Sequence, residues 1–194
     1  MRRIGEWGTW VGAWVLAIAL SVVPVGAQAA EWVHEGMADE GKMTYGFRVG
    51  PSFMTQSSGL STTGPALNFQ GMYGINKWFR FGMMLEWENH GLDAPRNGSL
   101  NTITLLPVNL EYRPGHFGAL IPYVTSGIGV NINTKDQADS FAWRFGAGLD
   151  YPMTSLFQGA PKGLMLNMET AWKRNSADGD GSSMGLLFGV RHTF

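Results

Sequence analysis

The chain has 194 residues with 14 Lys and Arg against 15 Asp and Glu, a formal net charge of −1, and it contains no cysteine. This length suits a single domain, and the near-neutral charge without a basic patch argues against nucleic-acid binding. Without cysteine there is no disulfide framework, so hydrogen bonding and packing must hold the fold.

The first 29 residues have the pattern of a secretory signal peptide. Two arginines open the segment, residues 10–25 are apolar and uncharged, and Ala27-Gln28-Ala29 fits a small-residue cleavage site. An N-terminal membrane anchor is the alternative, but the cleavage site and the strand-rich remainder favour removal after Ala29. Residues 30–43, which are polar and lack a clear period, are then expected to form a short periplasmic leader.

From residue 44 onward, apolar residues alternate with polar or small ones. A period of two predicts β-strands with two different faces. Eight strands are predicted, at residues 44–54, 64–76, 78–88, 101–113, 120–132, 141–151, 163–173 and 183–194. The number is even, and the lengths are those that tilted strands need to cross a bilayer.

The fourth predicted strand has the least regular alternation. Its first half, residues 103–107, is ambiguous, and its apolar face is assigned to Leu106, Val108, Leu110 and Tyr112. The polar connections that follow the first, third, fifth and seventh strands are expected to face the cell exterior. They are residues 55–63, 89–100, 133–140 and 174–182.

The remaining connections are expected to face the periplasm. They are residues 76–77, 114–119 and 152–162. The first two are short, as periplasmic turns of outer-membrane barrels are. The third is long enough to hold structure of its own, and it carries Pro152 and Pro161, where a missing N–H does not interrupt a strand ladder.

No run of 18 apolar residues follows the N-terminal segment, so a membrane-spanning form of this chain must be a closed barrel. The lack of charge on the aromatic face, the glycine on the opposite face and the girdles described next predict that the aromatic face contacts lipid. The aromatic face is nearly free of charge, and a Lys or Arg there would cost about 2–4 kcal/mol at mid-bilayer. The opposite face combines charges with glycine, which makes room for long side chains in a narrow eight-stranded lumen.

Aromatic residues near the strand ends predict two interfacial girdles. Trp87, Trp143 and Trp172 lie toward the outer loops, and Tyr112 and Tyr151 lie toward the inner turns. A soluble lipocalin-like barrel, which would place the aromatic face inward, is the alternative. The predicted fold class is all-β, an eight-stranded antiparallel transmembrane β-barrel that follows a cleaved signal peptide.

The inward face carries six basic and five acidic residues. They are Arg48, Arg80, Arg113, Arg144, Lys173 and Arg191, and Glu86, Glu88, Glu111, Asp150 and Glu169. Because unpaired buried charges are costly, these residues are expected to form a connected network. The network either fills and blocks the lumen or forms a gated ion path or a small catalytic site, and the near balance of charge favours the filled lumen.

No catalytic, cofactor-binding or metal-binding residue is predicted. The four histidines are placed in the leader (His34), an outer loop (His90), an inner turn (His116) and the lipid face (His192), none in an evident Ser/His/Asp set. The Gly-x-Gly stretches lie inside strands, unlike phosphate loops. Asp178 and Asp180 lack the distal Glu of a calcium loop.

The last strand ends in Phe188-Gly189-Val190-Arg191-His192-Thr193-Phe194. It resembles the C-terminal strand of outer-membrane proteins, in which the terminal Phe helps the assembly machinery recognise the chain. That resemblance implies that Phe194 is a C-terminal assembly signal, while a soluble sheet that happens to end in Phe is the alternative. With the Gly-rich stretches 122–130 and 145–151, the mature chain resembles the small outer-membrane β-barrels of the OmpA-barrel, OmpX and OmpW type.

The resemblance implies location in the outer membrane of a Gram-negative envelope. It implies contact with outer-membrane lipid and lipopolysaccharide and with the barrel assembly machinery, and leaves the oligomeric state open. The favoured function is a non-enzymatic integral membrane protein with a structural or surface-interaction role. An OmpW-like narrow channel for small or hydrophobic solutes is the alternative. A lipid A-modifying enzyme is less favoured, because the His-x-Ser-Asn stretch of the deacylases is missing from residues 172–176.

Overall fold

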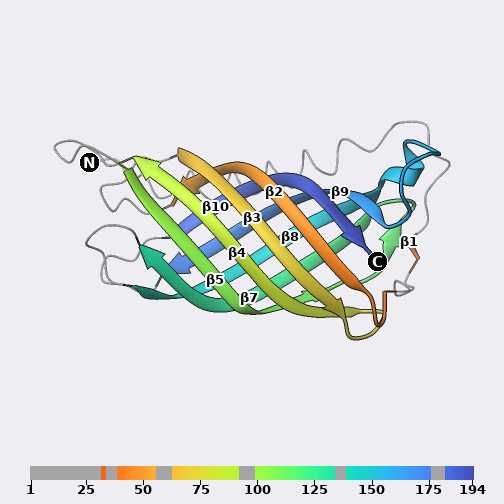
Figure 1. The fold of residues 1–194 in the computed structure, drawn as a ribbon, viewed down its shortest axis with the longest axis horizontal. Helices are drawn as coiled ribbons and strands as arrows, with labels where there is room; N and C mark the ends of the chain where they lie inside the picture. The colour runs from red at the N-terminus through yellow and green to blue at the C-terminus, as the bar shows by residue number, and fades with distance from the viewer. Residues whose placement is uncertain (1–31, 34–38, 56–62, 92–98, 134–138, 176–181) are drawn as a thin grey trace. The chain divides into compact units, whose positions relative to one another are not determined.

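The computed structural model describes residues 32–33, 39–55, 63–91, 99–133, 139–175 and 182–194. Eight long strands are β2 (Met43–Met54), β3 (Thr63–Gly74), β4 (Phe79–Gly91), β5 (Ser99–Tyr112), β7 (Ile121–Asn133), β8 (Ser140–Pro152), β9 (Leu164–Asn175) and β10 (Ser182–Thr193). They form a closed antiparallel barrel in the order β10-β2-β3-β4-β5-β7-β8-β9. The strands are tilted relative to the long axis of the barrel (Figure 1). The predicted eight-stranded barrel is therefore confirmed.

The barrel closes between the first and last long strands. Val190 of β10 pairs with Phe47 of β2, and Thr193 pairs with Thr44. Beyond the ladder, the backbone N–H of Phe194 donates to the carbonyl of Met43 at 2.9 Å. Each strand therefore has a hydrogen-bonded neighbour on both sides, which leaves no open sheet edge.

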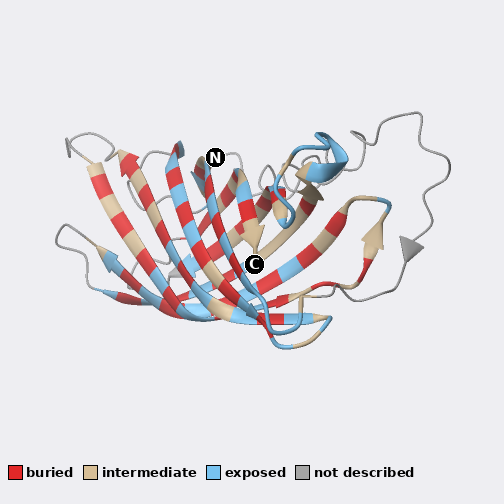
Figure 2. Ribbon diagram, turned by 45° about the vertical axis from the view of Figure 1, so that its right-hand side comes forward, coloured by how far each residue is buried: buried red, intermediate tan, exposed pale blue. Residues whose placement is uncertain are grey.

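Burial alternates along the strands, as a period of two requires (Figure 2). In β2, Tyr45, Phe47 and Val49 are 45%, 48% and 43% exposed, whereas the side chain between the last two, Arg48, is fully buried. The aromatic face thus points outward and the charged face inward. The lipocalin-like alternative, with the aromatic face inside, is wrong.

A β-bulge in β5 changes which residues face the interior. Gly82 of β4 pairs with Asn109 of β5, but Met84, two residues further along β4, pairs with Leu106, three residues away in β5. The pairing of β5 with β7 contains the same one-residue shift. Pro107 and Val108 consequently both point outward. Proline is tolerated at a bulge because the extra residue leaves the ladder and needs no N–H.

The bulge corrects the assignment of Leu106 to the apolar outer face. Leu106 is fully buried and packs in an interior cluster with Met84 and Ala142. Leu105, which precedes the bulge, is 38% exposed, and Leu110, which follows it, is 41% exposed. Strict alternation failed here because the inserted residue shifts the parity within a single strand.

We call the barrel end with connections 75–78, 113–120 and 153–163 the short-turn end, and the opposite end the long-loop end. In the first connection, Asn76 Oδ1 accepts hydrogen bonds from the backbone N–H groups of Trp78 (2.8 Å) and Phe79 (2.9 Å). The third contains a short 3₁₀-helix, η2 (Met153–Ser155). No helix in the described part of the chain is long and apolar enough to span a membrane.

Two further strands of two residues each, β1 (Trp32–Val33) and β6 (His116–Phe117), pair with each other outside the barrel. The segment expected to be a leader, residues 30–43, therefore contains a strand and the first residue of β2. The proposed signal peptide, residues 1–29, lies outside the described residues. The largest difference in strand bounds is at β4, predicted to end at residue 88 but continuing to Gly91.

The bulge predicts the labelling pattern of single cysteines, since the natural chain has none. Cysteine substituted at Leu105 or at Val108 should react with a lipophilic maleimide in the folded, detergent-solubilised barrel, because both positions face outward. Cysteine at Leu106 should be protected until the barrel is unfolded. If Leu106 and Val108 reacted alike in the folded barrel, the bulge would be absent.

Candidate functional site

The interior of the barrel holds all eleven predicted charged residues. Each of these eleven residues is at most 5% exposed. They project from β2, β4, β5, β8, β9 and β10 and from Arg113, which directly follows β5. The interior is thus a polar core built from most of the barrel wall, and its charges fall into three groups along the barrel.

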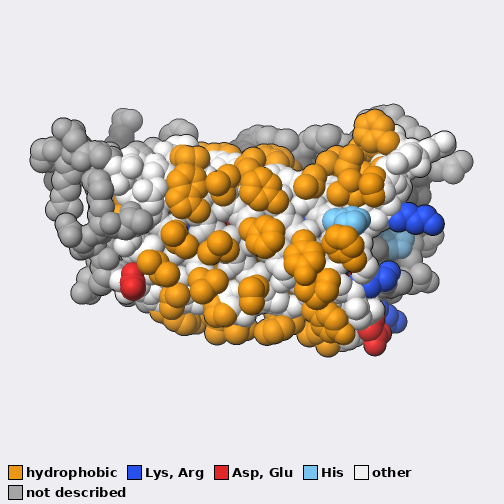
Figure 3. Space-filling model, in the orientation of Figure 1, with side chains coloured by type: hydrophobic (Ala, Val, Ile, Leu, Met, Phe, Trp, Pro, Cys, Tyr) orange, Lys and Arg blue, Asp and Glu red, His pale blue; other side chains and the backbone are white. Residues whose placement is uncertain are grey.

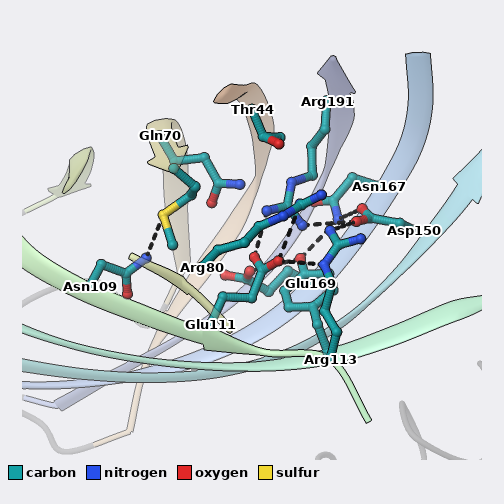
Figure 4. Close-up of polar contacts among 12 residues, drawn as sticks. Thr44, Gln70, Arg80, Asn109, Glu111, Arg113, Asp150, Asn167, Glu169 and Arg191 are labelled. Carbon is teal, nitrogen blue, oxygen red and sulfur yellow. Dashed lines mark hydrogen bonds and ion pairs between the residues drawn. The ribbon is translucent and has the colours of Figure 1, made fainter. Parts of the chain in front are cut away.

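The first group lies at the short-turn end, where three arginines surround two carboxylates (Figure 4). Glu111 accepts hydrogen bonds from Arg113 Nε at 2.7 Å and Arg80 Nη1 at 3.4 Å, and also pairs with Arg191. Asp150 accepts from Arg191 Nη1 at 2.9 Å and also pairs with Arg113. These five residues leave one positive charge without a carboxylate of its own.

Asp39 supplies the missing negative charge. Its carboxylate pairs with Arg80 and lies 3.8 Å from Arg113 Nη1, and its side chain is 14% exposed. Asp39 lies in the segment expected to be a leader, residues 30–43, and this role was not predicted. The sequence feature that could have indicated it is the inward face's excess of one basic residue over its acidic residues.

Backbone hydrogen bonds hold the segment around Asp39 against β3. Gly41 N–H donates to the carbonyl of Gly74 at 2.9 Å, and Gly74 N–H donates to the carbonyl of Lys42 at 2.9 Å. The Lys42 N–H donates in turn to the carbonyl of Asp39 at 3.1 Å. Gly41 adopts a φ of 77°, a conformation that favours glycine.

The second group occupies the middle of the barrel. Arg48 pairs with Glu169, and its Nε and Nη2 donate to Asn68 Oδ1 at 3.1 and 2.7 Å. Arg144 pairs with the second oxygen of Glu169 and donates from Nε to Glu86 Oε2 at 3.1 Å. Each arginine is therefore held by a carboxylate from another strand.

The third group lies toward the long-loop end and centres on Lys173. Its Nζ is 2.6 Å from Glu88 Oε2 and 3.3 Å from Glu86 Oε1. Glu88 also accepts hydrogen bonds from the hydroxyl groups of Ser52 at 2.8 Å and Ser183 at 3.2 Å. Glu86 contacts both Lys173 and Arg144, so it joins the second group to the third.

Tyr123 and Asn167 join the first group to the second. The Tyr123 hydroxyl donates to Glu169 Oε2 at 2.8 Å and accepts from Asn167 Nδ2 at 2.8 Å. Asn167 Nδ2 also lies 2.6 Å from Asp150 Oδ1. A continuous chain of polar contacts therefore runs from Asp39 to Glu88.

The alternation of apolar and polar residues in 120–132 puts Tyr123 on the inward face, but it does not reveal this bridging role. Its ring lies 4.8 Å from the Arg191 guanidinium carbon and 5.9 Å from that of Arg113. A Cβ at Gly148 would come within 2.4 Å of the tyrosine ring. Glycine at this position thus makes the room that Tyr123 needs.

Among the described histidines, only His90 departs from its predicted place. His90, expected in an outer loop, belongs to β4, is 3% exposed and lies 4.0 Å from Glu88. His192 Nε2 donates a hydrogen bond to the carbonyl of Lys162 at 3.1 Å, while His34 lies outside the described residues. Asp178 and Asp180 are also outside them, and within the described ranges no group of three His, Cys, Asp or Glu residues could hold a metal ion.

On the face seen in Figure 3, the outer surface of the barrel is covered by apolar side chains, and most of the charged ones lie at the right-hand end. The five predicted girdle aromatics are at least partly exposed, with Trp143 at 49%. Trp87, Trp143 and Trp172 lie near the long-loop ends of β4, β8 and β9. Tyr112 and Tyr151 lie at the short-turn ends of β5 and β8.

Three solved structures illustrate the similarity of this barrel to known folds. Neisserial surface protein A (NspA) is 17% identical, with a TM-score of 0.57 over 80% of this chain and 98% of that chain. OprG from Pseudomonas aeruginosa is 14% identical, with a TM-score of 0.51 over 80% of this chain and 97% of that chain.

Ail, the attachment invasion locus protein of Yersinia pestis, is 12% identical, with a TM-score of 0.51 over 80% of this chain and 99% of that chain. No curated protein matches the sequence. A family model described as outer membrane protein beta-barrel domain matches residues 15–194. The chain therefore belongs to the outer-membrane protein β-barrel family and is a protein of the bacterial outer membrane.

Proposed function

We propose that this protein is a non-enzymatic integral outer-membrane barrel with a structural or surface-interaction role, whose interior is filled by its own side chains. The continuous chain of polar contacts from Asp39 to Glu88 carries this proposal. In an eight-stranded barrel the interior is only wide enough for side chains. A solute crossing it would have to separate buried ion pairs.

The energetic cost of such separation supports a closed interior. Removing one partner of a buried ion pair costs about 3–5 kcal/mol, because it leaves an uncompensated charge. The pairs made by Arg48, Arg144 and Arg191 are all buried. The same pairing speaks against catalysis, since these groups already serve as partners for one another.

The outer surface supports contact with outer-membrane lipid and lipopolysaccharide. Its strands present aromatic and branched apolar side chains, such as Phe69 at 51% and Val124 at 50% exposure. The aromatic residues near both ends of the barrel would sit at the two membrane interfaces. The barrel assembly machinery is the proposed partner of Phe194, which is 67% exposed.

The buried network predicts the effect of losing Glu169. Glu169→Gln should lower the free energy of unfolding by about 3–5 kcal/mol, because Arg48 and Arg144 lose a shared carboxylate. Urea unfolding in lipid vesicles, followed by tryptophan fluorescence, measures this change. Glu40→Gln makes the same chemical change at an exposed site and should leave the midpoint unaltered. Equal behaviour of the two variants would contradict a network that stabilises the barrel.

The filled interior predicts that the purified protein does not conduct. In planar lipid bilayers the folded barrel should give no discrete open-channel steps, because its lumen is occupied by paired side chains. A general porin recorded in the same membranes shows that steps would be detected. Reproducible steps from the wild-type protein would instead support the narrow-channel alternative.

The proposed assembly signal predicts a difference between folding in cells and folding in vitro. Phe194→Ala should reduce the amount of folded barrel in the outer membrane several-fold, measured by its heat-modifiable gel mobility. Refolding of the purified variant should remain near wild type, because the Phe194 ring makes T-shaped contacts with two described aromatic rings, Tyr45 and His192, and is otherwise largely exposed. Phe188→Ala, which removes a lipid-facing ring from the same strand, is the control. Normal assembly of Phe194→Ala in cells would refute the signal.

A further inference from the structure

A pocket of about 490 Å³ opens at the short-turn end of the barrel and reaches Asp39. Its wall is largely apolar and includes Ile121, Leu164 and Met165. Lys42 and Lys162 also line it, and both are exposed. The pocket therefore connects solvent with the carboxylate that completes the first charge group, past two positive charges that attract anions.

The buried groups behind Asp39 form a site rich in donors. Arg80, Arg113 and Arg191 carry three positive charges, against two negative charges on Glu111 and Asp150. Arg80 Nε and Arg113 Nη1 have no hydrogen-bond partner within the described parts of the chain, although these residues are 2% and 1% exposed. Without Asp39, this region would hold one uncompensated positive charge and several free N–H donors.

We propose that the position of the Asp39 carboxylate is a binding site for a small carboxylate anion, which Asp39 itself occupies in the structure. Arginine pairs well with carboxylates because its planar group can donate two parallel hydrogen bonds. Arg80 and Arg113 both contact the carboxylate of Asp39. The pocket is lined by Asp39, so it leads an external carboxylate to the residue whose place it would take beside these arginines.

The charge of the site selects a monoanion. Three arginines and two carboxylates lack one negative charge, so a carboxylate restores neutrality, while a phosphate dianion would leave an excess negative charge. Excess buried charge is costly in either direction. This inference goes beyond the proposed function, because a filled lumen requires Asp39 only as a fixed counter-ion and does not require the site to accept an external ligand.

Chemical rescue tests the proposal. In Asp39→Ala the full chain is unfolded by urea in detergent micelles containing about 100 mM sodium acetate, or sodium chloride at equal ionic strength. If acetate binds with a dissociation constant of about 10 mM, it should raise the folded-to-unfolded ratio of the variant about tenfold. The wild-type protein should respond equally to both salts, because Asp39 occupies the site.

Control variants separate binding from general salt effects. Glu40→Ala removes a neighbouring exposed carboxylate and should show no preference for acetate. Asp39→Asn keeps the shape of the side chain and should be rescued less than Asp39→Ala, because the amide still fills the site. If Asp39→Ala does not refold in chloride, its refolding yield in acetate becomes the measurement. Failure in both salts, or equal stability in both, overturns the proposal. Sodium phosphate at the same ionic strength serves as a third salt, and stronger rescue by phosphate than by acetate overturns the choice of a carboxylate.

Discussion

The pairing of arginine guanidinium groups with carboxylates inside the barrel is the constraint on which the rest of the structure depends. Removing an ion from water costs several kcal/mol, even after the protein relaxes around it. Each interior cation therefore needs a carboxylate within reach, from another strand or, for Arg80 and Arg113, from Asp39 outside the barrel strands. The same crowding explains why glycines such as Gly148 face inward, because larger residues would displace the side chains that bridge the charge groups.

The two faces of the wall have opposite chemistry, and lipid requires this arrangement. A closed antiparallel barrel satisfies its backbone hydrogen bonds within itself, so the outer surface is free to be apolar. Polar and charged groups are accommodated only inside, where partners replace water. Figures 2 and 3 show the two consequences together, as alternating burial along the strands and an apolar outer band.

Much of this organisation could be predicted from the sequence, because the period of two is local. It predicts all eight barrel strands, the outward aromatic face and the inward placement of the eleven charged residues that the strands and Arg113 contribute to the network. The errors were non-local. Leu106 was assigned outward because a one-residue bulge depends on pairing with neighbouring strands. His90 was assigned to a loop because the pairing of β4 with β5 extends beyond the regular alternation. Asp39 lies in a segment without periodicity, so only a charge count indicated it.

The join between β2 and β10 links residues from opposite ends of the described chain, such as Phe47 and Val190. Contacts of such long sequence separation form slowly, because a large loop must be ordered before they contribute. Until that seam is made, β2 and β10 each expose a row of unpaired backbone groups that can template aggregation. Before closure, the chain therefore has two unpaired strand edges at which it can aggregate. This risk ends only when the last strand, β10, pairs with β2.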